Sequence, residues 1–416
     1  MVRKNLKQIA AFHDKTIYQF LLCGRQSGKT TLMKWKLAQC IANMPANSDI
    51  FYIGPTNQQA MDLVWDPFKD LFEYNRWKVK SHKQAQTFTF SNKRKVYVIG
   101  AEKIRRVRGH RAFHIFCDEV GFYSTPLKYV WEACEGALAT VNGGLTMATT
   151  PPGKATDAYD WYLDHLSKPD WNFHSWASID NPAISKEFIE RAKANSDPRS
   201  FRQEYEASWE SYEGLAYYNF DEKVHIKKQE DFNDNLPVIL HFDFNVNPTT
   251  LLVGQRYQSL YSMKKEYSLK NSSTERTIEA FCEDHKDKAG RWLLKIRGDS
   301  SGRSRSSTTG YADYHYIHQA LNKYGFKYQH EVPAANPPIV DRVRHVNSYL
   351  KNCNGQHKIE FDPSMADTIK DLSSQETDGR FPVDKNNLGH KADAVGYGVY
   401  WDWMKTREIK SSSILL

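Results

Sequence analysis

The chain has 416 residues, of which 40% are hydrophobic and 25% are charged, and its formal net charge is +8. This length and composition indicate a soluble globular protein of two or three domains. The sequence shows no apolar run long enough to cross a membrane and no apolar leader, so we expect neither a membrane span nor a secretory signal. The six scattered cysteines lack metal-ligand spacing and are expected to be reduced thiols. The positive charge mildly favours a polyanionic partner.

A glycine-rich loop lies between a predicted strand over residues 16–22 and a predicted helix. The backbone N–H groups of such a loop, at the N-terminus of a helix, form a cradle for phosphate. Lys29 is placed to reach the β- and γ-phosphates of a nucleotide, and Thr30 to hold Mg²⁺. Cys23 stands where the P-loop pattern has its first glycine, and the alternative is an ordinary glycine turn. The predicted nucleotide-binding residues are Gly24, Arg25, Gln26, Ser27, Gly28, Lys29, Thr30 and Thr31.

Further strands alternate with helices up to about residue 150, which predicts a mostly parallel sheet with its ligand at the carboxyl ends of the strands. We expect strands over 49–55, 87–90 and 95–100 and a helix over 58–74. A basic segment follows, with candidates for an arginine finger or a DNA contact, although a solvated loop is the alternative. Its members are Lys103, Arg105, Arg106, Arg108 and Arg111. Arg25, inside the P-loop, is a separate candidate for charge stabilisation in cis.

Two acids end the apolar segment 113–119. In a P-loop fold the strand beside the loop ends near the Mg²⁺, so Asp118 would hold the Mg²⁺ shell and Glu119 would polarise the attacking water, whereas an acidic helix cap is the plainer interpretation. A third apolar segment, 145–150, ends in the hydroxyls of Thr149 and Thr150, which would sense the γ-phosphate. Residues 154–210 are expected to be a small helical and aromatic subdomain beside the nucleotide.

A second fold is predicted to begin at residue 237. Three strands, a helix, an acid-tipped strand and a late acidic helix are typical of the ribonuclease H arrangement. Its first strand, fourth strand and last helix would bring together Asp243, Asp299 and Asp393, which suit two Mg²⁺ or Mn²⁺ ions that cleave a phosphodiester. Each acid taken singly could instead be a turn former or an exposed helix residue. Glu266, Asp378 and Asp384 are further candidate ligands.

In content and order these motifs resemble the large terminase subunit of tailed bacteriophages, a DNA-packaging motor. The family's P-loop, Asp-Glu strand, hydroxyl-rich coupling motif and Arg-Gly dipeptide have counterparts here, and so do the end of its ATPase region and three nuclease motifs. One departure is Gly389, where many members carry a further acid. The matching segments are Arg25–Thr30, Asp118–Glu119, Ala148–Thr150, Arg108–Gly109, Phe201–Tyr205, Asp243–Pro248, Gly298–Gly302 and His390–Ala394.

The resemblance implies an α/β fold with an N-terminal P-loop (RecA/ASCE-like) ATPase domain, a small helical lid and a C-terminal ribonuclease H-like nuclease domain. The expected boundaries are 1–153 for the core, 154–210 for the lid, 211–236 for a linker, 237–405 for the nuclease and 406–416 for a tail.

The resemblance also implies the ligands ATP with Mg²⁺, and two Mg²⁺ or Mn²⁺ in the nuclease. Implied partners are double-stranded DNA, the portal protein of the procapsid, a small terminase subunit and four further copies in a pentameric ring. Arg108 becomes the first choice for a finger acting in trans. The chain would work in the cytoplasm of the bacterial host, transiently docked on the procapsid, and be absent from the mature virion. The competing class is a cellular helicase or translocase with a fused nuclease.

Overall fold

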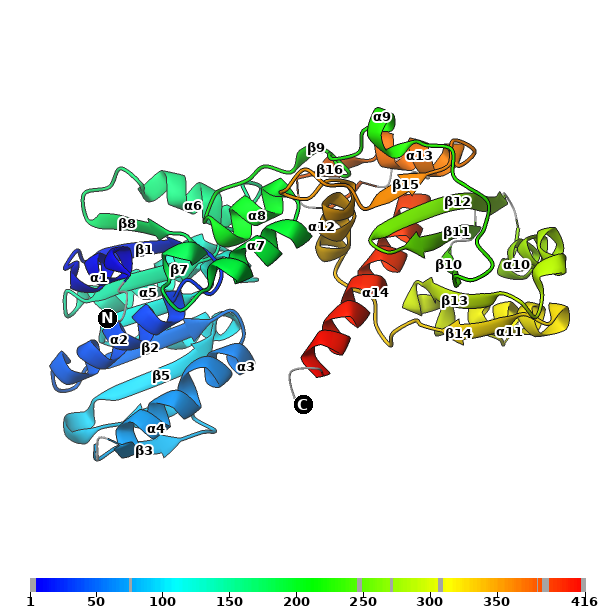
Figure 1. Ribbon diagram of the computed structural model, residues 1–416. Coiled ribbons are helices and arrows are strands. Elements are labelled where there is room, and N and C mark those ends of the chain that lie inside the picture. Colours follow the sequence, from blue (N-terminus) through cyan, green and yellow to red (C-terminus); the bar gives the residue numbers. More distant parts are fainter. Residues whose placement is uncertain are drawn as a thin grey trace. The chain divides into compact units, whose positions relative to one another are not determined.

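The computed structural model describes residues 5–74, 77–244, 249–269, 272–305, 310–379, 381–383 and 389–412. Contacts divide the chain into two compact units, shown in Figure 1. Unit 1 comprises Met1–Glu190 and Arg199–Ser211, and unit 2 comprises Arg191–Pro198 and Tyr212–Leu416. The segment 211–236, predicted as a linker, contributes β9 (Glu213–Leu215) and α9 (Glu222–His225) to unit 2.

The described strands of unit 1 form one mixed sheet in the order β3-β4-β5-β2-β6-β7-β1-β8. The strands from β5 to β8 in this order run parallel, and β3 and β4 run antiparallel at one edge. Their bounds are β1 (Tyr18–Cys23), β2 (Asp49–Gly54), β3 (Lys80–His82), β4 (Thr87–Thr89), β5 (Lys95–Gly100), β6 (Ala112–Asp118), β7 (Gly144–Thr149) and β8 (Trp171–Trp176). Because the parallel strands end at one edge, the ends of β1, β6 and β7 lie together.

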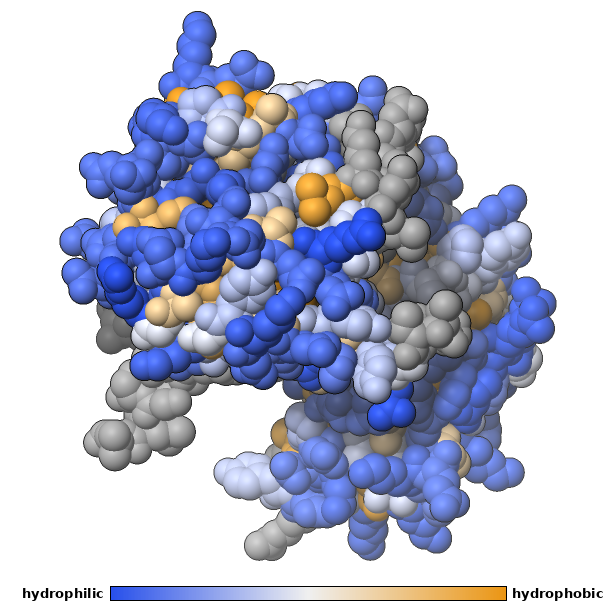
Figure 2. All heavy atoms as spheres, turned by 90° about the vertical axis from the view of Figure 1, so that its right-hand side faces the viewer, coloured by the Kyte–Doolittle hydropathy of each residue, from blue (hydrophilic) through white to orange (hydrophobic). Residues whose placement is uncertain are grey.

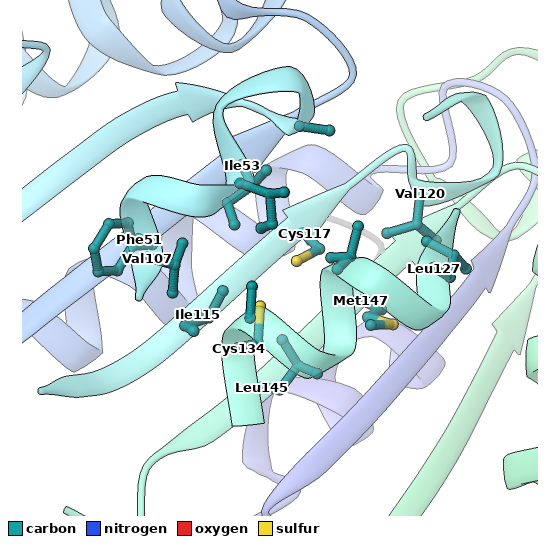
Figure 3. Close-up of a cluster of buried hydrophobic side chains, with 14 of the residues drawn as sticks. Phe51, Ile53, Val107, Ile115, Cys117, Val120, Leu127, Cys134, Leu145 and Met147 are labelled. Carbon is teal, nitrogen blue, oxygen red and sulfur yellow. The ribbon is translucent and has the colours of Figure 1, made fainter. Parts of the chain in front are cut away.

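Two apolar cores cover the two faces of this sheet. One contains the buried faces of α5 (Leu127–Ala139) and α6 (Asp157–His165), and Figure 3 shows part of it, including Cys117, Cys134 and Met147. The other is built from α1 (Leu6–His13), α2 (Lys29–Asn43) and α4 (Asp66–Tyr74). Alternate residues of β1 enter opposite cores, Phe20 in the first and Leu21 in the second, as the period of two in a strand requires. The remaining helices are α3 (Asn57–Ala60), α7 (Lys186–Asn195) and α8 (Pro198–Tyr205).

Three expectations for unit 1 need correction. The helix predicted over 58–74 is interrupted by a π-helical turn at Met61–Trp65. Residues 154–210 are not wholly helical, because β8 lies among them and pairs in parallel with β1. Trp171–Trp176 was missed because it has no β-branched residue. Finally, β6 is not the direct neighbour of the P-loop strand, since β7 lies between them.

Unit 2 contains a mixed sheet in the order β14-β13-β10-β11-β12-β15. The first three strands predicted for this fold, β10, β11 and β12, form an antiparallel meander, and β13 lies parallel to β10. The strands are β10 (Val238–Asp243), β11 (Thr249–Tyr257), β12 (Leu260–Leu269), β13 (Leu293–Gly298), β14 (Lys327–His330) and β15 (Ile359–Phe361). A separate ribbon pairs β9 with β16 (Glu376–Asp378).

Helices also cover both faces of the second sheet. One core includes α10 (Thr274–Asp284) and α11 (Asp313–Tyr324). The other includes α12 (Ile339–Leu350), α13 (Ala366–Ser374) and α14 (His390–Ser412). Ile239 of β10 enters this second core, so Asp243, four residues later, projects from the same face as α14.

The face turned toward the viewer in Figure 2 is mostly hydrophilic, with small scattered apolar patches. In the described part of the chain no helix has the length and apolar character needed to cross a membrane. The six cysteines, all within the described ranges, are free thiols as expected.

Candidate nucleotide and nuclease sites

The loop between β1 and α2 needs its glycines. Gly28 is the N-cap of α2 with a φ of 91°, a left-handed conformation that glycine adopts without a steric penalty. Gly24 lies against other backbone, because a Cβ there would approach the carbonyl oxygen of Tyr205 to 2.6 Å. The loop therefore has the tight course that the P-loop interpretation requires, with the glycine one position later than the usual pattern.

Side chains outside the loop hold its carbonyl groups. Since C=O and N–H point to opposite sides of a trans peptide, carbonyls tied outward leave the following N–H groups directed into the loop, where that of Ser27 donates to the carbonyl of Gly24 at 3.2 Å. The carbonyl oxygens of residues 25, 26, 27 and 28 accept hydrogen bonds, at 2.6, 2.7, 3.0 and 2.8 Å, from Ser178 Oγ, Asn181 Nδ2, Trp176 Nε1 and Gln8 Nε2. These four residues could not be found from the sequence, since nothing local to them signals the loop.

Lys29 lies among the polar groups that end β6 and β7. Its ammonium pairs with the carboxylate of Glu119 and donates a hydrogen bond to Thr150 Oγ1 at 3.2 Å. The other oxygen of Glu119 accepts the N–H of Thr150 at 3.2 Å. Burial opposes the charge of Lys29, but Glu119 and Asp118 raise its pKa above the ordinary value, so Lys29 is a cation here.

Asp118 is fully buried and is held by two hydroxyl groups on one oxygen. Tyr52 donates to its Oδ2 at 2.6 Å, and Thr30 donates to the same atom at 3.2 Å. Burial raises the pKa of Asp118, and Lys29 and the hydroxyl donors oppose that rise. Tyr52 was missed in the sequence because it is one aromatic residue within a buried strand.

The other predicted residues of unit 1 are placed differently. Thr149 Oγ1 accepts the N–H of Gly121 and donates to the carbonyl of Thr150, so it ties β7 to the turn after β6. The side chain of Arg25 is 67% exposed and lies 3.9 Å from Glu204. Arg108 is exposed at the end of a 3₁₀ helix. The structure therefore gathers Lys29, Thr30, Asp118, Glu119 and Thr150, and leaves both arginines at the surface.

The gathered residues fit a nucleotide with Mg²⁺. The inward N–H groups and Lys29 suit phosphate oxygens, and Thr30 with Asp118 supplies the oxygen donors that Mg²⁺ prefers. Bound Mg²⁺ would neutralise phosphate charge.

In unit 2, two of the predicted acids end neighbouring parallel strands. Asp243 is the last residue of β10 and is 3% exposed, and Asp299 follows β13. The N–H of Asp299 donates to the carbonyl of Phe242 at 3.1 Å, which fixes the two strand ends side by side. Asn336 Nδ2 donates to Asp299 Oδ1 at 2.6 Å.

The third acid, Asp393, lies in the first turn of α14, which packs against β10 (Figure 1). Arg342 of α12 donates to Asp393 Oδ1 at 2.6 Å, and His390 lies 3.4 Å from Asp243 Oδ2. Burial raises the pKa of Asp393 to about 6, with Arg342 opposing the rise and Asp243 adding to it. Arg342 was missed because no local pattern in α12 marks it as a partner of an acid 51 positions later.

All three acids act on Tyr397, one turn after Asp393. Burial raises the pKa of Tyr397, Arg342 lowers it, and the charges of Asp299, Asp393 and Asp243 raise it further. The three carboxylates thus share one neighbourhood, and their chemistry suits a hard divalent cation. However, no group of three His, Cys, Asp or Glu side chains within the described ranges is arranged to hold a metal ion. The donor chemistry fits, but the side chains that the structure describes do not form a ready coordination shell.

The further candidate metal ligands have other partners or lie outside the described residues. Glu266 accepts the N–H groups of Asp367 and Thr368 at 3.0 and 2.9 Å, at the start of α13. Asp378 is exposed in β16 and accepts the N–H of Phe381 at 2.6 Å. Asp384 and residues 245–248 of the first nuclease motif lie outside the described residues.

Together the two units define a P-loop ATPase joined to a ribonuclease H-like fold. Residues 20–224 match the family model described as "Terminase large subunit, T4likevirus-type, N-terminal". The chain belongs to the large terminase subunits, the DNA-packaging motors of tailed bacteriophages, as the sequence motifs predicted.

Solved structures of the large terminase from a thermophilic bacteriophage share the fold over nearly the whole chain. One crystal form has a TM-score of 0.63 at 18% identity and covers 94% of this chain and 97% of that one. The complexes of the same terminase with ADP and ATP-γ-S have TM-scores of 0.62 and 0.61 at 19% and 20% identity, each covering 96% of this chain and 98% of the other. No curated protein sequence matches the chain.

Proposed function

We propose that the chain hydrolyses ATP in unit 1 to drive double-stranded DNA through the portal into a procapsid, and cuts concatemeric DNA in unit 2. The observation that carries the ATPase half is the connected cluster of Lys29, Glu119 and Thr150, with Asp118 and Thr30 beside it. The complexes of the thermophilic phage terminase with ADP and ATP-γ-S support nucleotide binding at this fold.

Each residue of the cluster has a distinct role in this proposal. Lys29 and the inward N–H groups of the P-loop bind the β- and γ-phosphates. Thr30 and Asp118 hold the Mg²⁺ shell, and Glu119 accepts the proton of the attacking water. Thr150 bonds to both Lys29 and Glu119, so a change in either partner on hydrolysis reaches the end of β7. Arg25 in cis and Arg108 in trans are the proposed charge stabilisers.

For the nuclease half, we assign Asp243, Asp299 and Asp393 as the acids that hold Mg²⁺ or Mn²⁺ for phosphodiester cleavage. When bound, such ions activate water and stabilise the leaving oxygen. The side-by-side ends of β10 and β13 and the packing of α14 on β10 support the assignment. Since metals contact phosphates and not bases, cutting at this site is expected to show little sequence preference.

The proposed function requires several copies of this chain to assemble. An arginine finger in trans requires neighbouring copies, which fits a pentameric ring on the portal vertex, and a small terminase subunit would select the viral DNA. The chain would act in the host cytoplasm, dock transiently on the procapsid and be absent from the mature virion.

Three assays on the purified chain test this function: ATP turnover with and without double-stranded DNA, plasmid cleavage with Mg²⁺ or Mn²⁺, and strand separation on a forked duplex. We expect DNA to stimulate turnover, metal-dependent cleavage, and no strand separation. ATP-dependent separation of the fork would instead support a helicase with a fused nuclease. The meander of unit 2 already argues against that alternative, because it takes the place of a second RecA-like sheet.

A further inference from the structure

Arg342 is a buried cation inside the candidate nuclease site. Arg342 is 3% exposed, and its guanidinium donates a hydrogen bond to Asp393 Oδ1 at 2.6 Å. Arg342 Nε is buried and has no hydrogen-bond partner among the described residues. A buried charge with an unsatisfied donor is costly to maintain, so its position needs an explanation.

The surrounding fold is shaped to receive this side chain. A Cβ on Gly396 of α14 would approach Arg342 Cγ to 2.6 Å, so a glycine in the middle of a helix opens the space for it. Glycine lowers helix stability at such a position, and the close packing of Arg342 accounts for its presence. The guanidinium also lies over the ring of Tyr397, 4.2 Å from its centroid, which is a favourable cation–π contact.

The charges around Arg342 indicate what this side chain does. Asp243, Asp299 and Asp393 share one neighbourhood, and three carboxylates repel one another without a cation. Arg342 neutralises one of them, and His390 lies 3.4 Å from another. The same contact removes Asp393 Oδ1 from the donors that face a metal, which agrees with the lack of a ready shell in the described residues.

We propose that the Arg342 guanidinium is a resident counter-cation of the nuclease acids, which holds Asp393 in the metal-free chain and competes with a divalent cation for that carboxylate. The inference rests on the proposed nuclease function. Arg342 is a positioning residue in this account. It neutralises Asp393 until metal binds, and Tyr397 offers the displaced guanidinium a second contact.

The test measures Mn²⁺ binding to the full chain by isothermal titration calorimetry, without DNA and without nucleotide. Arg342→Gln should bind Mn²⁺ about tenfold more tightly than the wild type, a gain of about 1.4 kcal/mol. It should also melt at a lower temperature without metal, and Mn²⁺ should raise its melting temperature more than that of the wild type. Adding Asp393→Asn should abolish the gain in affinity, since the competition acts through that carboxylate.

Arg256→Gln is the matched control. Arg256 pairs with Asp402, which lies on α14 like Asp393 and follows it by nine residues. It should leave Mn²⁺ affinity at the wild-type value. Arg342→Lys, which keeps the charge but loses the planar fork, should bind Mn²⁺ with an affinity between those of the wild type and Arg342→Gln. Unchanged or weaker Mn²⁺ binding by folded Arg342→Gln would overturn the inference while leaving the proposed nuclease intact.

A measurement on the wild type avoids any dependence on the folding of Arg342→Gln. In the chain labelled with ¹⁵N-arginine, the Nε–H signal assigned to Arg342 should shift as Mg²⁺ is added, in step with metal saturation. A signal unmoved at saturation would refute the displacement. Absence of Mn²⁺ binding in the wild type and in Arg342→Gln alike would instead refute the metal site proposed for unit 2, and the competition with it.

Discussion

Replacing Lys29 with alanine should abolish ATP hydrolysis and also destabilise unit 1. Lys29 is 6% exposed, pairs with Glu119 and lies near Asp118, which is fully buried. Removing one partner of a buried ion pair costs about 3–5 kcal/mol because the other charge is left uncompensated. Since 29% of the Glu119 side chain is exposed to water, the lower value of about 3 kcal/mol applies.

This loss of stability can be measured by differential scanning calorimetry without nucleotide. In domains of 150–250 residues about 1 kcal/mol shifts Tm by about 2–4 °C, so Lys29→Ala should lower the Tm of unit 1 by about 6–12 °C. The double variant Lys29→Ala/Glu119→Gln should recover part of the loss. Lys36→Ala is the control: Lys36 lies on the same helix, is equally buried and bonds to the neutral amide of Gln19.

The pH dependence separates charge from packing. Burial raises the pKa of Asp118 above 3.8, and Lys29 opposes the rise, so Lys29→Ala should raise that pKa further. A carboxyl with a raised native pKa binds more protons when folded, so stability falls as pH rises from 3.8 through the native pKa. The loss of stability in Lys29→Ala relative to the wild type should vanish below about pH 3.8. It should be complete above the Asp118 pKa of the variant. A deficit that is constant with pH, or retained ATP turnover, would refute the reasoning.

Three further predictions concern catalysis. Glu119→Gln should bind ATP with Mg²⁺ but hydrolyse it on the order of 10²–10⁴ times more slowly in a phosphate-release assay, and an unchanged rate would exclude Glu119 as the base. Arg108→Ala should lose turnover, by on the order of 10³ or more, only in the assembled ring, and mixing it with Glu119→Gln chains should restore part of it. If no mixing ratio restores turnover, Arg108 is not a finger in trans. Replacing Asp243, Asp299 or Asp393 with Asn should abolish plasmid cleavage and leave ATP turnover unchanged. Normal cleavage by any one variant would exclude that acid from the nuclease site.

The parts predicted correctly from the sequence are those with local signals. The glycine-rich loop, its strand and its helix are contiguous, and β6 and β10 are apolar runs that end directly at an acid. By contrast, the donors that hold the P-loop carbonyls come from residues up to 155 positions away. β8 was missed because its aromatic and polar residues carry no aliphatic run. Its place beside β1 is set by tertiary packing.

The nuclease site also depends on contacts between residues that lie far apart in the sequence. The order of strands and helices predicts that three acids converge, and the shared effect on Tyr397 agrees with that convergence. Which acid pairs with which cation depends on how α12 packs against α14. Glu266 illustrates the converse. It was expected at a strand end as a metal ligand, whereas it lies within β12 and its carboxylate accepts N–H groups in the first turn of α13.

The packaging of DNA by the purified chain is the decisive measurement of its motor function. The purified chain, procapsids of the same phage bearing their portal protein, double-stranded DNA and ATP are mixed, and DNase-resistant DNA is measured. We expect ATP-dependent protection of DNA by the wild type and none by Lys29→Ala. ATP hydrolysis by the wild type without any DNase-resistant DNA would contradict the assignment of a packaging motor.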